Sequence, residues 1–146
     1  MKLVRALKQV SRMQGELKDL QGRLASCVSV LEENEYPEGF NELNAKIVQT
    51  SDALIGLRVR IMKTNVQFDM LGTILKLGEL KQEIDIARKI NIRSGVEVND
   101  YMGAKSKYKS QLTSAERTLL IKALQGHIER LTDSLDDFNA TTDLAD

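Results

Sequence analysis

Apolar residues recur every three or four positions along most of this chain, which predicts helices with one apolar face. The first such stripe begins at Leu3 and continues to Leu31, over about four heptads. Its members are Leu3, Leu7, Val10, Met13, Leu17, Leu20, Leu24, Val28 and Leu31. Polar and charged residues fill the positions between them, as expected for a solvent-exposed face.

Residues 35–39, Glu-Tyr-Pro-Glu-Gly, contain the only proline of the chain and predict a turn. A second apolar stripe then extends from Phe40 to Phe68. Two helices of about 30 residues joined by so short a turn form an antiparallel hairpin about 45 Å long. Because one arm cannot cover the whole stripe of the other, we expect further helices, from this chain or a neighbouring subunit, to complete the packing.

Two more helical patterns follow, one over residues 72–93 and one from about Thr113 onwards. Thr113 precedes Glu116 by three residues, which matches a capping box at the start of the last helix. Residues 94–112 have no helical period and predict a non-helical excursion, either functional or ordered as a small β-hairpin. The predicted fold class is all-α: a long antiparallel helical hairpin plus two further helices, one domain over residues 1–146, in an oligomeric helical bundle.

Composition narrows the class of partner. Aromatic residues make up 4% of the chain, with no Trp, which favours aliphatic helix-on-helix packing. The formal net charge is zero, so we expect neither nucleic acid nor a membrane surface as partner. The charged amino-terminal residues do not look like a signal peptide, and Cys27 is the only cysteine, so a cytoplasmic location is expected.

The charges are unevenly distributed. Residues 58–109 hold eleven Lys and Arg against six Asp and Glu, whereas residues 129–146 hold six acids and one Arg. One interpretation is that the acidic end lies against the basic middle, within one subunit or between neighbours. The alternative is an anion site in the middle segment.

The sequence offers little catalytic chemistry. His127 is the only histidine, and the nucleophile-elbow, P-loop and dinucleotide fingerprints do not occur. The carboxylates near the carboxyl end, such as Asp133 and Asp137, lack EF-hand spacing and are interpreted as a solvated face. We therefore expect no enzyme, no metal site and no cofactor.

Two polar runs interrupt the apolar stripes, at residues 63–65 and 139–144. Thr64 continues an apolar series, and a buried Thr or Asn without a partner costs about 1–3 kcal/mol. The runs either fix helix register and satisfy helix ends, or line a ligand pocket with nearby cations. The candidate ligand-binding residues are Lys63, Thr64, Asn65, Arg88, Arg93, Asn139, Thr141, Thr142 and Asp143.

The same residues carry a family resemblance. The opening Met-Lys-Leu, the run 61–65 (Ile-Met-Lys-Thr-Asn), a third helix ending near Arg88 and the closing run 135–144 (Leu-Asp-Asp-Phe-Asn-Ala-Thr-Thr-Asp-Leu) resemble the septicolysin-like family of small bacterial and phage proteins. The resemblance spans essentially the whole chain. It implies an all-helical fold with a short non-helical excursion before the last helix, and its name implies a cytolysin.

These observations lead to three functional hypotheses. The first is a non-catalytic homo-oligomeric binding protein that sequesters a small phosphate-bearing or nucleotide-like ligand between subunits, as a phage anti-defence sponge in the host cytoplasm would. The second is a purely structural coiled-coil oligomer or protein-interaction module. The third is the cytolysin of the family name, against which no stretch is apolar enough to span a bilayer.

Overall fold

A computed structural model describes residues 1–98 and 103–145, which form four α-helices and one two-stranded sheet. The chain divides into two compact units. Unit 1 comprises Met1–Leu71 and Asp136–Asp146, and unit 2 comprises Gly72–Leu135. The chain therefore leaves unit 1 once and returns to it for its last residues.

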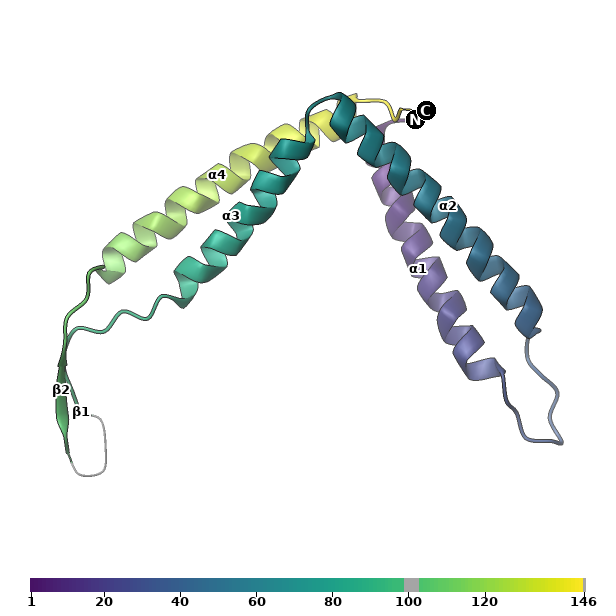
Figure 1. Ribbon diagram of the computed structural model, residues 1–146, viewed down its shortest axis with the longest axis horizontal. Coiled ribbons are helices and arrows are strands. Elements are labelled where there is room, and N and C mark those ends of the chain that lie inside the picture. Colours follow the sequence, from purple (N-terminus) through teal and green to yellow (C-terminus); the bar gives the residue numbers. More distant parts are fainter. Residues whose placement is uncertain (99–102, 146) are drawn as a thin grey trace. The chain divides into compact units, whose positions relative to one another are not determined.

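Unit 1 is built on the helical hairpin that the two long stripes predicted. Helix α1 (Leu3–Cys27) and helix α2 (Phe40–Gln67) run antiparallel, side by side (Figure 1). The amino-terminal turns of α1 pack on the carboxyl-terminal half of α2, and the last turn of α1 packs on the first turn of α2. The hairpin prediction is confirmed, and α2 begins at the predicted residue.

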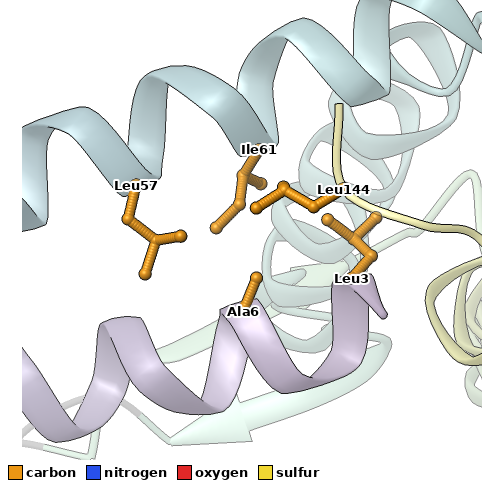
Figure 2. Packing of buried hydrophobic residues seen from close by; sticks show 5 residues of the cluster. All are labelled: Leu3, Ala6, Leu57, Ile61 and Leu144. Carbon is orange, nitrogen blue, oxygen red and sulfur yellow. The ribbon is translucent and has the colours of Figure 1, made fainter. Parts of the chain in front are cut away.

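The core of unit 1 consists of two apolar clusters along this hairpin. One joins Leu3 and Ala6 of α1, Leu57 and Ile61 of α2, and Leu144 near the carboxyl end of the chain (Figure 2). The other contains Leu20, Cys27 and Leu43. Cys27 is thus a free thiol packed in the core. A free cysteine behaves as a small apolar side chain, so burial among aliphatic residues is expected.

Helix α1 ends at Cys27, four residues before the end of the predicted stripe. Cys27 already packs against Leu43, in the first turn of α2, so residues beyond it have no partner helix. Leu31 is accordingly 67% exposed. The spacing of apolar residues predicted a longer helix than the structure has. Helical turns are stabilised mainly by packing of their apolar face, and these residues have no partner to pack on.

Unit 2 contains helix α3 (Leu71–Lys89) from Gly72 onwards and helix α4 (Ser114–Thr141) as far as Leu135. Figure 1 shows the two helices running alongside each other, and Arg117 Nη1 donates to the Ile90 carbonyl (2.7 Å), joining the start of α4 to the end of α3. The buried stripe of α3 is Leu77, Leu80, Ile84 and Ala87. No described residue of α4 is fully buried.

The predicted capping box begins α4. The Thr113 N–H donates to Glu116 Oε2 (2.7 Å), and the Glu116 N–H donates to Thr113 Oγ1 (3.1 Å). Two amide donors that the helix leaves unpaired are thereby satisfied. This sequence prediction is confirmed.

The excursion between α3 and α4 contains a β-hairpin. Strands β1 (Gly95–Val98) and β2 (Lys105–Tyr108) pair antiparallel, with Gly95 opposite Tyr108. Gly95 has a φ of 80°, a conformation that glycine adopts without steric cost. The hairpin alternative for residues 94–112 is confirmed, and the molecule is mostly helical as predicted. One domain over residues 1–146 and an oligomeric bundle stay predictions.

Candidate functional site

The two polar runs come together in unit 1, through Thr64. This side chain is fully buried. Its hydroxyl donates to the Arg60 carbonyl (2.8 Å) and accepts the N–H of Ala145 (2.9 Å), directly after the second run. Arg60 Nε in turn donates to the Ala145 carbonyl (2.9 Å). Thr64 therefore satisfies the backbone of the chain's last residues instead of facing a pocket.

The ends of the chain form a small antiparallel bridge in the same place. Lys2 and Asp143 are paired residues, flanked by hydrogen bonds from the Leu3 N–H to the Thr142 carbonyl (2.9 Å) and from the Leu144 N–H to the Met1 carbonyl (2.8 Å). These bonds hold Leu144 over the cluster in Figure 2. The second polar run thus fastens the carboxyl end to the start of α1.

Asp143 is occupied by this bridge. Its Oδ2 accepts a hydrogen bond from Lys2 Nζ (2.9 Å), and its Oδ1 lies 3.8 Å from the amino-terminal ammonium. The hydrogen bond from Lys2, with the nearby positive charges, holds the pKa of Asp143 below its ordinary value against the opposing effect of desolvation. The acidic end of the chain therefore contacts the amino terminus, and it is hydrogen-bonded to Arg60 and Thr64 of the basic middle segment through Ala145.

Thr141 and Thr142 of the second run are hydrogen-bonded to the last turn of α4. Thr141 Oγ1 donates to the Asp137 carbonyl (2.8 Å), and the Thr142 N–H donates to the Phe138 carbonyl (2.9 Å). Asn139 is half-buried. Lys2 Nζ also donates to the Thr141 carbonyl (2.7 Å), so one lysine satisfies both a helix-end carbonyl and a carboxylate.

Asn65 differs from its neighbours. Its side-chain oxygen is buried and has no hydrogen-bond partner within the described residues. Its backbone carbonyl accepts the N–H of Met70 (2.8 Å), and the N–H of Asp69, whose φ is 56°, donates to the Val66 carbonyl (3.1 Å). These two bonds form a Schellman motif, which ends α2. The helix-termination alternative for this run matches the geometry.

Two predicted cations belong to unit 2 and are paired there. Arg88 Nη1 lies 3.7 Å from Asp85 Oδ1. Arg93 donates to Glu97 Oε2 (2.7 and 3.1 Å), and its guanidinium carbon lies 4.2 Å from the centre of the Tyr108 ring. Arg93 thereby braces the two strands of the hairpin. The structure brings together the Lys63–Asn65 run and the 139–143 run, and it places Arg88 and Arg93 in the other unit.

The most distinctive exposed surface was missed by the sequence reasoning. Helix α2 carries a second apolar row, about 140° around its axis from the row that packs on α1. We call this row the outer stripe; it consists of Val48, Ile55, Val59, Met62 and Val66, which are 48–63% exposed. Its signal was present in the sequence as a second series at heptad spacing. That series was overlooked because the inner series accounted for the hairpin.

A shallow groove lies on the carboxyl-terminal part of the outer stripe. It has a volume of about 420 Å³ and is lined by Val59, Met62, Lys63, Val66 and Gln67. Lys63 is exposed at its edge. The lining is apolar apart from Lys63 and Gln67, so the groove suits an apolar side chain better than an anion.

Other sites are not evident in residues 1–98 and 103–145. Within these ranges no group of three or more His, Cys, Asp or Glu side chains is placed to hold a metal ion. Over the same ranges, every helix is too short or too polar to cross a membrane.

The fold defines a class: a protein of two helical units, one a closed hairpin holding both chain ends and the other interrupted by a β-hairpin. Residues 11–144 match a family of unknown function, DUF6847, and the chain belongs to that family. No curated protein matches. A crystal structure of a functionally unknown conserved protein from Corynebacterium diphtheriae is similar, with 17% identity, 99% of each chain covered and a TM-score of 0.68. The two chains share their fold.

Proposed function

We propose that this protein is a non-catalytic helical protein that works as a homo-oligomer, with the outer stripe of α2 as its assembly face. The outer stripe is the observation that carries the proposal. A helix that is apolar on two sides requires a partner on each, and α1 supplies only one of them. Five apolar side chains over 19 residues of one helix exceed the scattered exposed apolar residues of ordinary monomers.

The site residues favour this role over ligand capture. Thr64, Thr141 and Asp143 direct their polar atoms to Ala145, Asp137 and Lys2 of the same chain. Groups engaged in this way hold the fold together, and a ligand would have to displace those bonds to use them.

Light scattering coupled to size-exclusion chromatography tests the proposal. We expect the wild-type chain to have at least twice the mass of one chain, and Val59→Asp to reduce it to a monomer, because a buried unpaired carboxylate is costly. Val28→Asp is the matched control, since Val28 is similarly exposed but lies outside the outer stripe. A wild-type chain that is monomeric at every concentration would contradict the proposal.

Sequestration of a small nucleotide-like ligand is the second candidate, and Asn65 is the observation that favours it. Its side-chain oxygen is a buried acceptor without a partner, which a donor N–H such as that of a nucleobase would satisfy, and Lys63, also on α2, is an exposed cation that suits a phosphate. Thermal shift with ATP, GTP, a cyclic dinucleotide and ADP-ribose tests this role. We expect a rise in melting temperature that Asn65→Ala abolishes and Asn44→Ala, on an exposed part of α2, preserves; no rise with any of the four excludes it.

The resemblance to septicolysin-like proteins, a phage origin and a cytoplasmic location stay proposals. The cytolysin reading makes a separate prediction, which is release of a trapped dye from phosphatidylcholine–phosphatidylglycerol vesicles at micromolar protein. Vesicles that remain sealed would exclude it and leave the assembly role in place.

A further inference from the structure

The outer stripe follows one heptad register along α2. Its d positions are Val48, Ile55 and Met62, and its a positions are Val59 and Val66. The remaining a position holds Asp52, which is exposed and has no salt bridge or hydrogen bond within the described residues. Because α1 packs on nearly the opposite side of α2, this face is exposed along its whole length in the described part of unit 1.

We propose that the outer stripe docks against the same stripe of a second copy, with the two α2 helices antiparallel and the two-fold axis between Gly56 and Arg58. This inference rests on the proposed homo-oligomer and names its interface. In antiparallel coiled coils, a positions pack on d positions of the partner. That rule is met along the whole stripe when Val48 lies level with the second copy's Val66, and Ile55 with the second copy's Val59.

Charge complementarity selects this arrangement. On one flank, the antiparallel register places Asp52 at nearly the same level as the second copy's Lys63, and symmetry repeats the pair. Lys63 is exposed and, like Asp52, has no ion pair or hydrogen bond within the residues described. The two pairs neutralise the only charge on the stripe.

A parallel pairing of the same stripe meets two repulsions. Identical residues lie level in a parallel dimer, so Asp52 would face the second copy's Asp52 at an interior a position. Arg58, at a g position, would then lie beside the second copy's Lys63 at an e position. Like charges juxtaposed at an interface oppose association.

Glycine at the axis fits the close contact. Gly56 occupies the e position nearest the two-fold axis, where it lies beside its own copy. A Cβ placed on Gly56 meets nothing within 4 Å in the single chain, so the absence of a side chain there has no explanation within unit 1. Across the axis, the missing side chains let the two helix backbones approach.

A charge exchange tests the register in the full-length protein. We expect Asp52→Arg and Lys63→Asp each to raise the dissociation constant of the dimer about tenfold or more at low salt, because each places like charges together. The double variant Asp52→Arg/Lys63→Asp restores the attraction with reversed polarity and should return close to wild type. Lys8→Asp, on the exposed face of α1, is the matched control and should leave the dimer unchanged. Failure of the double variant to recover would overturn the register.

Cross-linking supplies a second readout that survives a weakened dimer. In the antiparallel register, position 49 lies beside position 63 of the second copy, whereas the two positions 49 are about 24 Å apart. A short bismaleimide should therefore join a mixture of Gln49→Cys and Lys63→Cys chains, and should join neither variant alone. Cys27 is buried and present in every sample. Cross-linking of the wild-type chain therefore measures the background that Cys27 causes.

The outcomes separate the two proposals. A monomeric wild-type chain overturns both the homo-oligomer and this interface. An oligomer that Val59→Asp disrupts, but that shows neither the rescue nor the mixed cross-link, overturns only the antiparallel register. Dimerisation with rescue and the mixed cross-link establishes both.

Discussion

At the scale of single residues, Thr64, Thr141 and Asp143, three of the polar exceptions to the apolar stripes, have hydrogen-bond partners within the same chain. Thr64 is the clearest case. Its buried hydroxyl accepts the N–H of Ala145 in an otherwise apolar region, a role that a backbone carbonyl usually has. A valine of nearly the same shape would leave that N–H unsatisfied. The residue type is thus fixed by one hydrogen bond between segments 81 positions apart.

We predict that Thr64→Val lowers the free energy of unfolding by about 1–3 kcal/mol, because a buried N–H loses its acceptor. Urea unfolding followed by circular dichroism measures the change. Thr141→Val is the matched control, because the Thr141 hydroxyl is exposed and bonds within its own helix. Equal stability of both variants would show that Thr64 does not anchor the chain end.

Asp143 makes a prediction about pH. Its pKa in the folded chain is lowered, so its contribution to stability is present above the carboxyl's unfolded value of about 4 and is lost as the pH falls through the lower folded value. We expect Lys2→Met to move the Asp143 pKa up towards that unfolded value, as measured by a carboxyl NMR titration. Lys8→Met, which removes a lysine elsewhere on α1, should leave the titration in place.

At the scale of elements, helix ends are set by local chemistry that differs from one helix to the next. A capping box begins α4, whereas a Schellman motif with Asp69 in the left-handed region ends α2. Left-handed backbone costs a side-chain-bearing residue free energy that glycine does not lose.

We therefore predict that Asp69→Gly raises the free energy of unfolding by about 0.5–1 kcal/mol, and that Asp69→Ala gives no such gain. Thermal unfolding by calorimetry compares the two variants with the wild type. An alanine variant as stable as the glycine variant would mean that removal of the carboxylate, and not the backbone conformation, causes the effect.

At the scale of the whole molecule, the chain closes unit 1 with residues from both of its ends. Leu144 completes a core cluster with Leu3, Ala6, Leu57 and Ile61, and backbone bonds on either side hold it there (Figure 2). The residues that complete unit 1 therefore follow the whole of unit 2 in the sequence. Such long-range contacts slow folding, because closing a long loop costs entropy before the contact stabilises the chain.

We predict that Leu144→Ala destabilises the protein by about 2–5 kcal/mol through lost burial and the cavity that remains. Protection of the Leu3 amide against hydrogen exchange should fall with it, since its acceptor is the Thr142 carbonyl. Leu31→Ala, at a 67% exposed position in the same unit, should stay within about 0.5 kcal/mol of wild type. An unchanged Leu3 amide in Leu144→Ala would show that the bridge does not depend on the core.

The sequence predicted local features well and distant contacts poorly. Heptad spacing located all four helices, Pro37 located the turn and the pair Thr113 and Glu116 located the start of α4, since each signal lies within a few residues. The spacing overran the end of α1, because a helix stops where its partner begins, and that place depends on Leu43 of another helix.

For the candidate site, the amino-acid types could be interpreted from the sequence, but their hydrogen-bond partners could not be predicted from it. The sequence alone determined that Thr64, Asn65 and the 139–144 run interrupt apolar faces and need hydrogen bonds, because a buried polar group without a partner costs free energy. Only the tertiary structure decided that Thr64 bonds to Ala145, that Asp143 pairs with Lys2 and that Arg93 braces a β-hairpin. The outer stripe shows the same division. Its heptad spacing is a property of the α2 sequence, but its exposure depends on α1, which packs on the inner row of α2 and leaves the outer stripe uncovered.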